Sequence, residues 1–227
     1  MQNQTAQILW RDGGVPVSAR FDDPYFSLQD GAAETRHVFL AGNDLPARFV
    51  PGFHIAELGF GTGLNLLLAW DSWSRSGCDG PLRFTSFEAF PMAPADMSKA
   101  HEAFPDFDGK RDAFRDAWRP EGGLMTLPGL ELQVIIGDAR ATLPAWDGRA
   151  DAWFLDGFSP AKNPELWSAD LLAEVGVHTA PGGSAATYTA AGFVRRGLAD
   201  AGFEVERCAG FGRKRHMTKA RKREGAE

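Results

Sequence analysis

Residues 57–65 read Glu57-Leu58-Gly59-Phe60-Gly61-Thr62-Gly63-Leu64-Asn65, with a glycine at every second position from 59 to 63. The apolar residues 53–56 before this stretch predict a β-strand, and the apolar run 64–70 predicts a helix. Because glycine has no Cβ atom, a ligand can lie against the backbone, and the N-terminus of the following helix presents unpaired N–H groups. The stretch therefore predicts a strand–loop–helix unit that binds a nucleotide cofactor.

The spacing of the glycines distinguishes between two cofactor classes. A dinucleotide-binding loop reads GxGxxG, in which the third glycine lets helix and strand pack closely. This chain reads ExGxGxG instead. The carboxylate of Glu57 would repel a pyrophosphate, whereas it suits the ammonium group of S-adenosylmethionine. The pattern favours the methyl donor; a nicotinamide-dependent oxidoreductase and a glycine-rich turn without a ligand are the alternatives.

The composition is that of one globular domain. The chain has 227 residues, of which 44% are hydrophobic and 24% are charged, enough to bury a core without disulfides or metals. Cys78 and Cys208 form no metal-binding or redox spacing, so no metal is expected. The first ten residues lack the pattern of a signal peptide, and no apolar run reaches membrane-spanning length. We expect a cytoplasmic protein with no membrane partner.

The charge distribution is uneven. The formal net charge of −6 argues mildly against a large nucleic-acid footprint. Cations nevertheless gather near the C-terminus, at Arg213, Lys214, Arg215, Lys219, Arg221, Lys222 and Arg223. Such a cluster can bind phosphates, and a solvated tail that serves solubility is the alternative.

Predicted strands alternate with predicted helices along the chain. Seven strands are expected, at residues 53–56, 82–87, 132–136, 152–155, 185–189, 203–208 and 213–219. The alternation predicts an α/β fold with a doubly wound, mostly parallel seven-stranded sheet, and the short link between the last two strands predicts an antiparallel hairpin. We divide the chain into an N-terminal cap segment (1–50), a catalytic domain (51–220) and a basic tail (221–227).

Four carboxylates stand at the carboxyl ends of the first four predicted strands, where ligands bind in such sheets. Glu57 lies at the first, Glu88 follows the second, Asp138 the third and Asp156 the fourth. We expect Glu88 to accept the ribose hydroxyls, and Asp138, with the amide of Ala139, to contact the adenine. Asp138 is also a good N-cap for the next predicted helix, and the two roles are compatible.

The segment LDGFSPAKNPELW (155–167) predicts the reaction centre. Methyl transfer to an amine needs an uncharged nitrogen and an acceptor for the released proton, and the carboxylate of Asp156 supplies that acceptor. Phe158 and Trp167 offer flat apolar walls suited to a nucleobase, and Lys162 offers a phosphate contact. Helix capping by Asp156 and an exposed loop lysine at 162 are the structural alternatives.

Several motifs together resemble one known family. They are the stretch from FDDPYF to LPARF near the start, AELGFGTGLN, TSFEAFP, GDAR, WFLDGFSPAKNPELW and FGRKRHM. From about residue 21 to about 217, the chain resembles the methyltransferase domain of the bacterial bifunctional protein MnmC and its standalone relative MnmD. The resemblance implies a class I S-adenosylmethionine-dependent fold without a metal. It also implies methylation of the aminomethyl group of a tRNA wobble uridine, giving 5-methylaminomethyl-2-thiouridine.

The resemblance also implies site residues. The predicted contacts to the methionine part of the cofactor are Glu57, Gly59, Gly61, Thr62, Gly63 and Asn65. Glu88 would lie at the ribose, Asp138 by the adenine and Asp156 beside the methyl group. Phe60, Ala89, Ala139 and Gly157 complete the predicted cofactor-binding set. Tyr25, Phe26 and Asn43, from the N-terminal family segment, are expected to line the substrate pocket with Phe158, Lys162 and Trp167.

Partners and alternatives remain open at this level. The bifunctional relatives add a flavin-dependent oxidase that generates the aminomethyl substrate, so an oxidase or another enzyme would supply it here. The tRNA anticodon loop is the expected partner. A methyltransferase acting on a small molecule or a protein amine is the second hypothesis, and a noncatalytic tRNA-binding module is the third.

Overall fold

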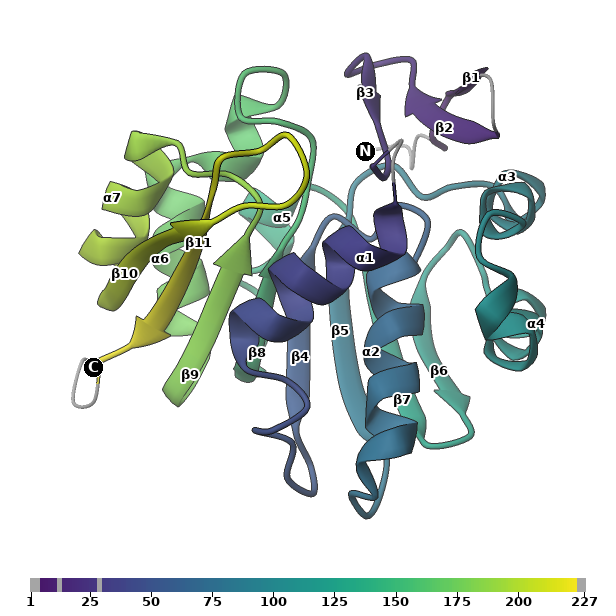
Figure 1. Cartoon of the computed structure of the whole chain (residues 1–227), viewed down its shortest axis with the longest axis horizontal. Helices are drawn as coiled ribbons and strands as arrows, with labels where there is room; N and C mark the ends of the chain where they lie inside the picture. Colours follow the sequence, from purple (N-terminus) through teal and green to yellow (C-terminus); the bar gives the residue numbers. More distant parts are fainter. Residues whose placement is uncertain (1–4, 12–13, 28–29, 224–227) are drawn as a thin grey trace.

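The computed structural model describes residues 5–11, 14–27 and 30–223. Its main feature is a mixed sheet with the strand order β10-β11-β9-β8-β4-β5-β7-β6 (Figure 1). The strands are β4 (His54–Leu58), β5 (Leu82–Glu88), β6 (Gly123–Leu127), β7 (Leu130–Ile136), β8 (Ala150–Leu155), β9 (Thr179–Thr187), β10 (Phe203–Ala209) and β11 (His216–Lys222). The five central strands β7, β5, β4, β8 and β9 are parallel. Strand order reverses on either side of β4, which creates the crevice where ligands bind in doubly wound sheets.

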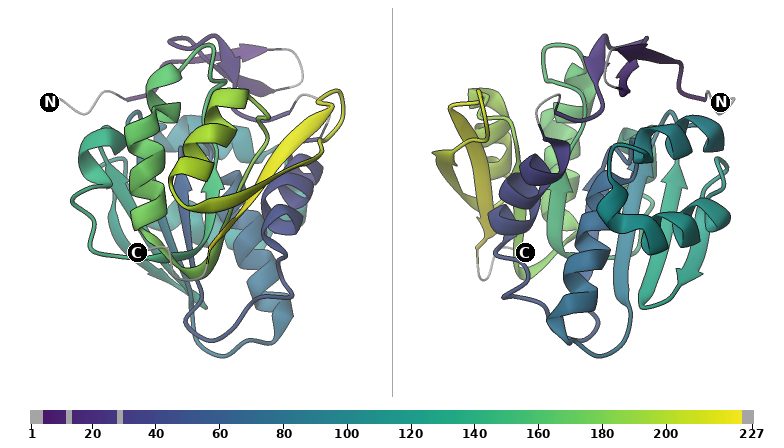
Figure 2. Two further views of the ribbon diagram at one scale, coloured as in Figure 1. Left: turned by 90° about the vertical axis from the view of Figure 1, so that its left-hand side faces the viewer. Right: turned by 45° about the vertical axis from the view of Figure 1, so that its right-hand side comes forward.

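Helices cover both faces of this sheet, so the core has two halves (Figure 2). One half is formed by side chains of the sheet with those of α2, α3, α4 and η1, and the other by side chains of the sheet with those of α5, α6 and α7. The helices are α1 (Gly31–Thr35), η1 (Arg36–Leu40), η2 (Ala41–Asn43), α2 (Leu64–Ser76), α3 (Pro94–His101), η3 (Pro105–Phe107), α4 (Asp108–Ala117), α5 (Ala139–Thr142), η4 (Pro164–Trp167), α6 (Ala169–Val177) and α7 (Gly192–Asp200). The central strands are buried on both faces, as is typical of parallel sheets.

A separate small sheet is built from the N-terminal residues. It consists of β1 (Ile8–Arg11), β2 (Val15–Ser18) and β3 (Asp23–Pro24), paired in that order. Figure 1 shows it in purple above the carboxyl ends of the central strands. The N–H of Ala6 donates to the carbonyl of Pro91, and the N–H of Ser159 donates to the carboxylate of Asp23. The N-terminal segment that contains the small sheet therefore contacts the loops after both β5 and β8.

The predicted α/β class, the mostly parallel sheet and the C-terminal hairpin are confirmed, with two differences in detail. The main sheet has eight strands among the described residues, because β6 pairs antiparallel with β7 and extends the edge. Strand β11 continues to Lys222, which pairs with Phe203, so two residues assigned to the basic tail belong to the sheet. Residues 224–227 of that predicted tail lie outside the described residues.

Two classes of structural feature are not found among the described residues. No helix there is long and apolar enough to cross a bilayer. No group of three or more histidine, cysteine or carboxylate side chains there is arranged to hold a metal ion.

Candidate active site

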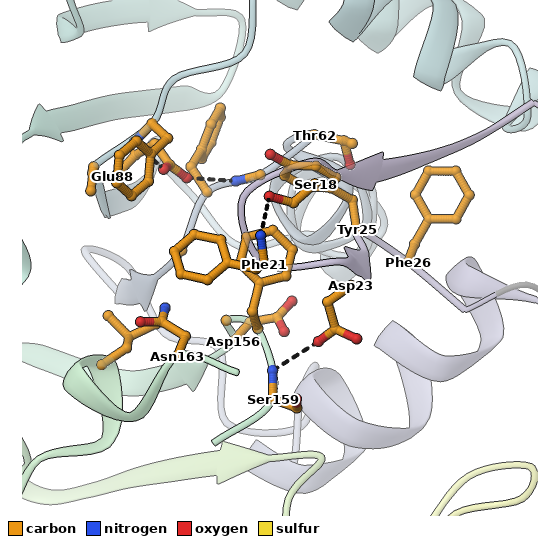
Figure 3. Close-up of a pocket in the computed structure, with 18 of the residues that line it drawn as sticks. Ser18, Phe21, Asp23, Tyr25, Phe26, Thr62, Glu88, Asp156, Ser159 and Asn163 are labelled. Carbon is orange, nitrogen blue, oxygen red and sulfur yellow. Dashed lines mark hydrogen bonds between the residues drawn. The ribbon is translucent and has the colours of Figure 1, made fainter. Parts of the chain in front are cut away.

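A cavity of about 1860 Å³ lies at the carboxyl ends of the central strands and beneath the small N-terminal sheet. Its walls come from the glycine loop after β4 and from the segments that follow β5, β7, β8 and β9. Figure 3 shows Thr62 of the glycine loop, Glu88 at the end of β5 and Asp156 after β8, together with residues of the N-terminal segment that also line the cavity. The volume exceeds that of a pocket for one drug-sized ligand, so a cofactor and part of a second molecule fit together.

The three glycines of the loop have positive φ angles of 86° at Gly59, 55° at Gly61 and 72° at Gly63. A Cβ atom on Gly59 would lie 2.3 Å from the carbonyl oxygen of Asp156, and one on Gly61 would lie 3.1 Å from the ring of Tyr25. From the sequence, glycine is predicted at these positions because a ligand must lie against the backbone. The structure adds a second reason, since left-handed backbone and close protein neighbours both exclude a side chain.

The side chain of Glu88, the last residue of β5, connects the glycine loop to the loop after β5. Its carboxylate accepts hydrogen bonds from the N–H of Gly61 at 2.9 Å and of Phe90 at 2.7 Å. Burial raises the pKa of Glu88, and these backbone donors partly oppose that effect. The carboxylate lines the cavity together with Ala89. Its remaining lone pairs can accept hydrogen bonds from hydroxyl groups of a ligand.

Asp138 caps α5, as one of its two predicted roles requires. Its side chain accepts from the N–H of Arg140 at 3.0 Å, and the Arg140 guanidinium binds both carboxylate oxygens. This pairing lowers the pKa of Asp138. Asp138, Ala139 and Arg140 all line the cavity, so a ligand that binds Asp138 competes with a neighbouring guanidinium.

Asp156 lies directly after β8, at the junction of β8 with the glycine loop. Its Oδ2 accepts a hydrogen bond from Nδ2 of Asn65 at 2.8 Å. Burial raises the pKa of Asp156 to about 7, an effect that the Asn65 donor and Lys214 oppose and the charge of Glu34 increases. A carboxylate with this pKa exchanges protons near neutrality, which suits a general base.

Aromatic rings form one wall of the cavity beside Asp156. The rings of Phe21 and Phe158 stack with centroids 4.7 Å apart, and Tyr25 meets Phe158 edge-on at 5.1 Å. Phe26 also lines the cavity and packs against Phe104. The structure therefore places Tyr25, Phe26 and Phe158 around one cavity, as predicted. Their contacts with a substrate stay predictions.

Three predicted site residues do not line the cavity, because they bind other parts of the protein. Glu57 is fully buried behind the glycine loop and accepts hydrogen bonds from Asn65 and Ser86. Asn43 is fully buried, where Nδ2 donates to the carbonyl of Phe39 and Oδ1 accepts from Ser184. Gly63 precedes α2, and a Cβ atom there would lie 3.1 Å from the ring of Phe60. These three residues therefore support the residues that line the cavity and do not face the cavity themselves.

Trp167 and Lys162 were also predicted to line the substrate pocket, but their side chains point elsewhere. Trp167 is 2% exposed, packs in the core and donates from Nε1 to the carbonyl of Phe158 at 3.0 Å. Lys162 donates to the carbonyl of Asp22 and lies 3.6 Å from the carboxylate of Asp23. Neither side chain lines the cavity. Trp167 supports the Phe158 loop, and Lys162 ties that loop to the N-terminal sheet.

The structure also adds residues that the sequence prediction missed. The hydroxyl of Tyr188 donates to the carbonyl of Gly157 at 2.6 Å, and its ring centroid lies 4.0 Å from the ammonium of Lys214. That ammonium pairs with Glu34 at 2.8 Å. Tyr188 follows β9 directly, so the rule that placed carboxylates at strand ends applies to it equally. Lys214 and Glu34 come from distant segments, and no local pattern joins them.

Comparisons with known proteins agree with this geometry. A family model described as S-adenosyl-L-methionine-dependent methyltransferase matches residues 109–223. The chain is 44% identical to the tRNA 5-methylaminomethyl-2-thiouridine biosynthesis bifunctional protein MnmC of Caulobacter sp. (strain K31) over 97% of its own length and 39% of the relative. It is 46% identical to MnmC of Caulobacter vibrioides over 94% of its length and 37% of the relative. The chain thus spans well under half of these relatives.

A solved structure extends the comparison. MNMC2 from Aquifex aeolicus matches with a TM-score of 0.72 and 27% identity over 96% of this chain and 71% of that one. A glycopeptide N-methyltransferase, MtfA in complex with sinefungin, matches with a TM-score of 0.50 and 17% identity over 86% of this chain and 87% of that one, which concerns the fold alone. The resemblance inferred from the motifs is confirmed by these relatives.

Proposed function

Because the chain belongs to the S-adenosyl-L-methionine-dependent methyltransferases, we propose that it methylates the aminomethyl group of 5-aminomethyl-2-thiouridine at the tRNA wobble position. The product is 5-methylaminomethyl-2-thiouridine. The observation that carries the proposal is the half-buried carboxylate of Asp156, which lines a cavity walled by the stacked rings of Phe21 and Phe158. The names of the relatives, at 44–46% identity over 94–97% of this chain, support the tRNA substrate.

The polar groups that line the cavity suit the cofactor of this family. S-adenosylmethionine supplies an electrophilic methyl group on a sulfonium. Glu88, Asp138 and Ala139 line the cavity; the carboxylate of Glu88 would accept the ribose hydroxyls, and Asp138 with Ala139 would contact the adenine. The loop from Gly59 to Thr62 would receive the methionine part, with Asn65 beside it. Glu57, which lies behind the loop, would act through Asn65 and not by direct contact.

Asp156 would prepare the acceptor amine. A primary alkylamine has a pKa of about 10, and its protonated form has no lone pair to attack with. Burial beside Phe158 and the positive charge of the sulfonium both favour the neutral amine. We therefore assign Asp156 the task of orienting the amine and taking its proton as, or before, the methyl group transfers.

The direct test is transfer of a labelled methyl group from S-adenosylmethionine to undermodified tRNA that carries aminomethyluridine, followed by nucleoside analysis. Label in 5-methylaminomethyl-2-thiouridine is the expected result. Label in a free amine or a protein amine, with none in tRNA, would overturn the proposal in favour of the second hypothesis. Binding of tRNA without any transfer would favour a noncatalytic module.

Glu88→Gln is expected to weaken binding of S-adenosylmethionine about ten- to a hundredfold, because it removes the charge from an acceptor of ligand hydroxyl groups. Isothermal titration calorimetry measures this change. Glu131→Gln, at an exposed position of β7, is the matched control and should bind as the wild type does. Equal affinities for both variants would remove Glu88 from the cofactor site.

Basic side chains at the rim of the cavity are the proposed contacts for the tRNA backbone. Arg213 and Lys214, in the loop between β10 and β11, line the cavity, and Arg215 next to them is exposed. The double variant Arg213→Gln/Arg215→Gln should raise the KM for tRNA, with less dependence on salt, because each lost phosphate contact reduces counterion release. Affinity for S-adenosylmethionine should not change. An unaltered salt slope in a titration of KM against ionic strength would contradict this assignment.

Several broader assignments belong to the same proposal. Residues 1–50 would act as a cap on the catalytic domain at 51–220. A flavin-dependent oxidase or another enzyme would have to supply the aminomethyl group. Action on tRNA places the reaction in the cytoplasm.

A further inference from the structure

A buried chain of hydrogen bonds runs from α1 to the carboxylate at the end of β8. Oγ1 of Thr35, the last residue of α1, donates to Oδ1 of Asn65 at 2.8 Å. Nδ2 of Asn65 donates to Oε1 of Glu57 at 2.9 Å and to Oδ2 of Asp156 at 2.8 Å. Oε2 of Glu57 accepts from Ser86 at 2.7 Å. Thr35 and Asn65 are 4% and 6% exposed, so water does not replace these partners easily.

The hydroxyl of Thr35 is the third hydrogen-bond partner that anchors the Asn65 amide. Both Nδ2 hydrogens face carboxylate oxygens, which accept, so the Oδ1 end must face the threonine. Without that hydroxyl, Oδ1 becomes an acceptor with no partner in this chain of bonds, and the Asn65 side chain loses one of its three anchors. The loosened side chain would shift and weaken the hydrogen bond that Nδ2 donates to Oδ2 of Asp156. A hydroxyl on α1 therefore controls the contact made with a carboxylate at the end of β8.

We propose that Thr35 and Asn65 are positioning residues for methyl transfer, which hold the carboxylate of Asp156 through Oδ2 in the orientation that accepts the proton of the substrate amine. The inference rests on the proposed function and deepens it. It gives Asn65, which lines the cavity, a role toward the protein in addition to the cofactor contact that the sequence predicts. It also links α1, within the predicted N-terminal cap, to the reacting carboxylate.

Charged and titratable groups from four elements face Asp156. They are Glu57 of β4, Glu34 of α1, Lys214 of the loop between β10 and β11, and Tyr188 after β9. Burial raises the pKa of Glu57 well above its ordinary value. The Asn65 amide and, to a smaller extent, the backbone N–H of Gly157 are neutral donors that stabilise the charged form of Asp156. Loss of the Asn65 donor should raise the pKa of Asp156 further.

The test compares Thr35→Val, which removes only the hydroxyl, with Thr35→Ser, which keeps it. Thr35→Val should lower kcat about tenfold while the Kd for S-adenosylmethionine changes less than threefold. The pKa of Asp156, followed by NMR titration of ¹³C-labelled aspartate, should rise. Thr35→Ser should restore both values toward those of the wild type. Thr179→Val, which removes a buried hydroxyl bonded to the carbonyl of Val175 far from the cavity, is the control for the loss of a buried hydroxyl.

The outcomes separate this inference from the proposed function. If the wild type methylates no tRNA, the proposed function fails, and the NMR titration still reports whether Thr35 acts on Asp156. If tRNA is methylated but Thr35→Val shifts neither kcat nor the pKa of Asp156, the positioning role is wrong. If the melting temperature of Thr35→Val falls only as much as that of Thr179→Val, and kcat per folded molecule is unchanged, Thr35 has a structural role alone and the inference is wrong.

Discussion

Replacing Asp156 with asparagine is expected to lower methyl transfer by about 10²- to 10⁴-fold, the usual contribution of a positioned general base. Asparagine has nearly the same shape and can still accept the hydrogen bond from Asn65, but it cannot take a proton. Calorimetry should show that S-adenosylmethionine still binds, and single-turnover assays should show the loss of rate. Turnover at the level of the wild type would exclude a chemical role for Asp156.

The pH dependence provides an independent check on the same residue. Because burial raises the pKa of Asp156 to about 7, kcat/KM of the wild type should rise with pH through a midpoint near 7 as the free enzyme loses this proton. The residual activity of Asp156→Asn should lack that midpoint. An identical midpoint in both proteins would assign the titration to another group.

Stability should change with pH in the opposite sense. The pKa of Asp156 is raised from 3.8 in the unfolded chain to about 7 in the folded protein, so the native state binds the proton more tightly. The stabilisation is complete below pH 3.8 and is lost as pH rises through 7. Asp156→Asn lacks this slope, so its stability relative to the wild type should increase between pH 4 and pH 7. Urea denaturation at pH 5 and pH 8 measures the difference and shows that lost activity is not lost folding.

Replacing Gly59 with alanine is expected to have the second large effect. The φ angle of 86° is disfavoured for alanine, and the added Cβ would lie 2.3 Å from the carbonyl oxygen of Asp156. The strained backbone costs about 1–3 kcal/mol, and relief of the overlap must move β8 or the glycine loop. Since a displacement of about 1 Å costs roughly a hundredfold in rate, both cofactor affinity and turnover should fall. Denaturation and calorimetry measure the two losses.

Gly77→Ala separates the two causes. Gly77 follows the last residue of α2 with a φ angle of 75°, and a Cβ atom added there would have no other atom within 4 Å. It should therefore show the backbone strain alone, with normal cofactor binding and turnover. If Gly59→Ala resembles Gly77→Ala in every assay, the contact between the glycine loop and the Asp156 carbonyl does not organise the site.

The sequence by itself determined the fold class, the glycine-rich strand–loop–helix unit and the edge of the sheet that carries the cavity. These follow from local patterns, because a strand, three alternate glycines and an apolar helix are adjacent in the chain, and parallel strands must end at the same edge. Glu88, Asp138 and Asp156 were located by that rule. Edge strand β6 was missed, since it is only five residues long and begins at a glycine, and its pairing with β7 decides its conformation.

Only the tertiary structure decided which of these side chains face the cavity. Pairing of β4 with β8 sets Leu58 opposite Leu155, so Glu57 lies inside its strand while Asp156 lies just beyond its own. The first carboxylate is consequently buried behind the loop, and the second reaches the cavity. Likewise, Asn43 and Trp167 turn to the core and Tyr188 meets Lys214 through contacts between distant segments. Strand register and packing are non-local, which is why no pattern within one segment contains them.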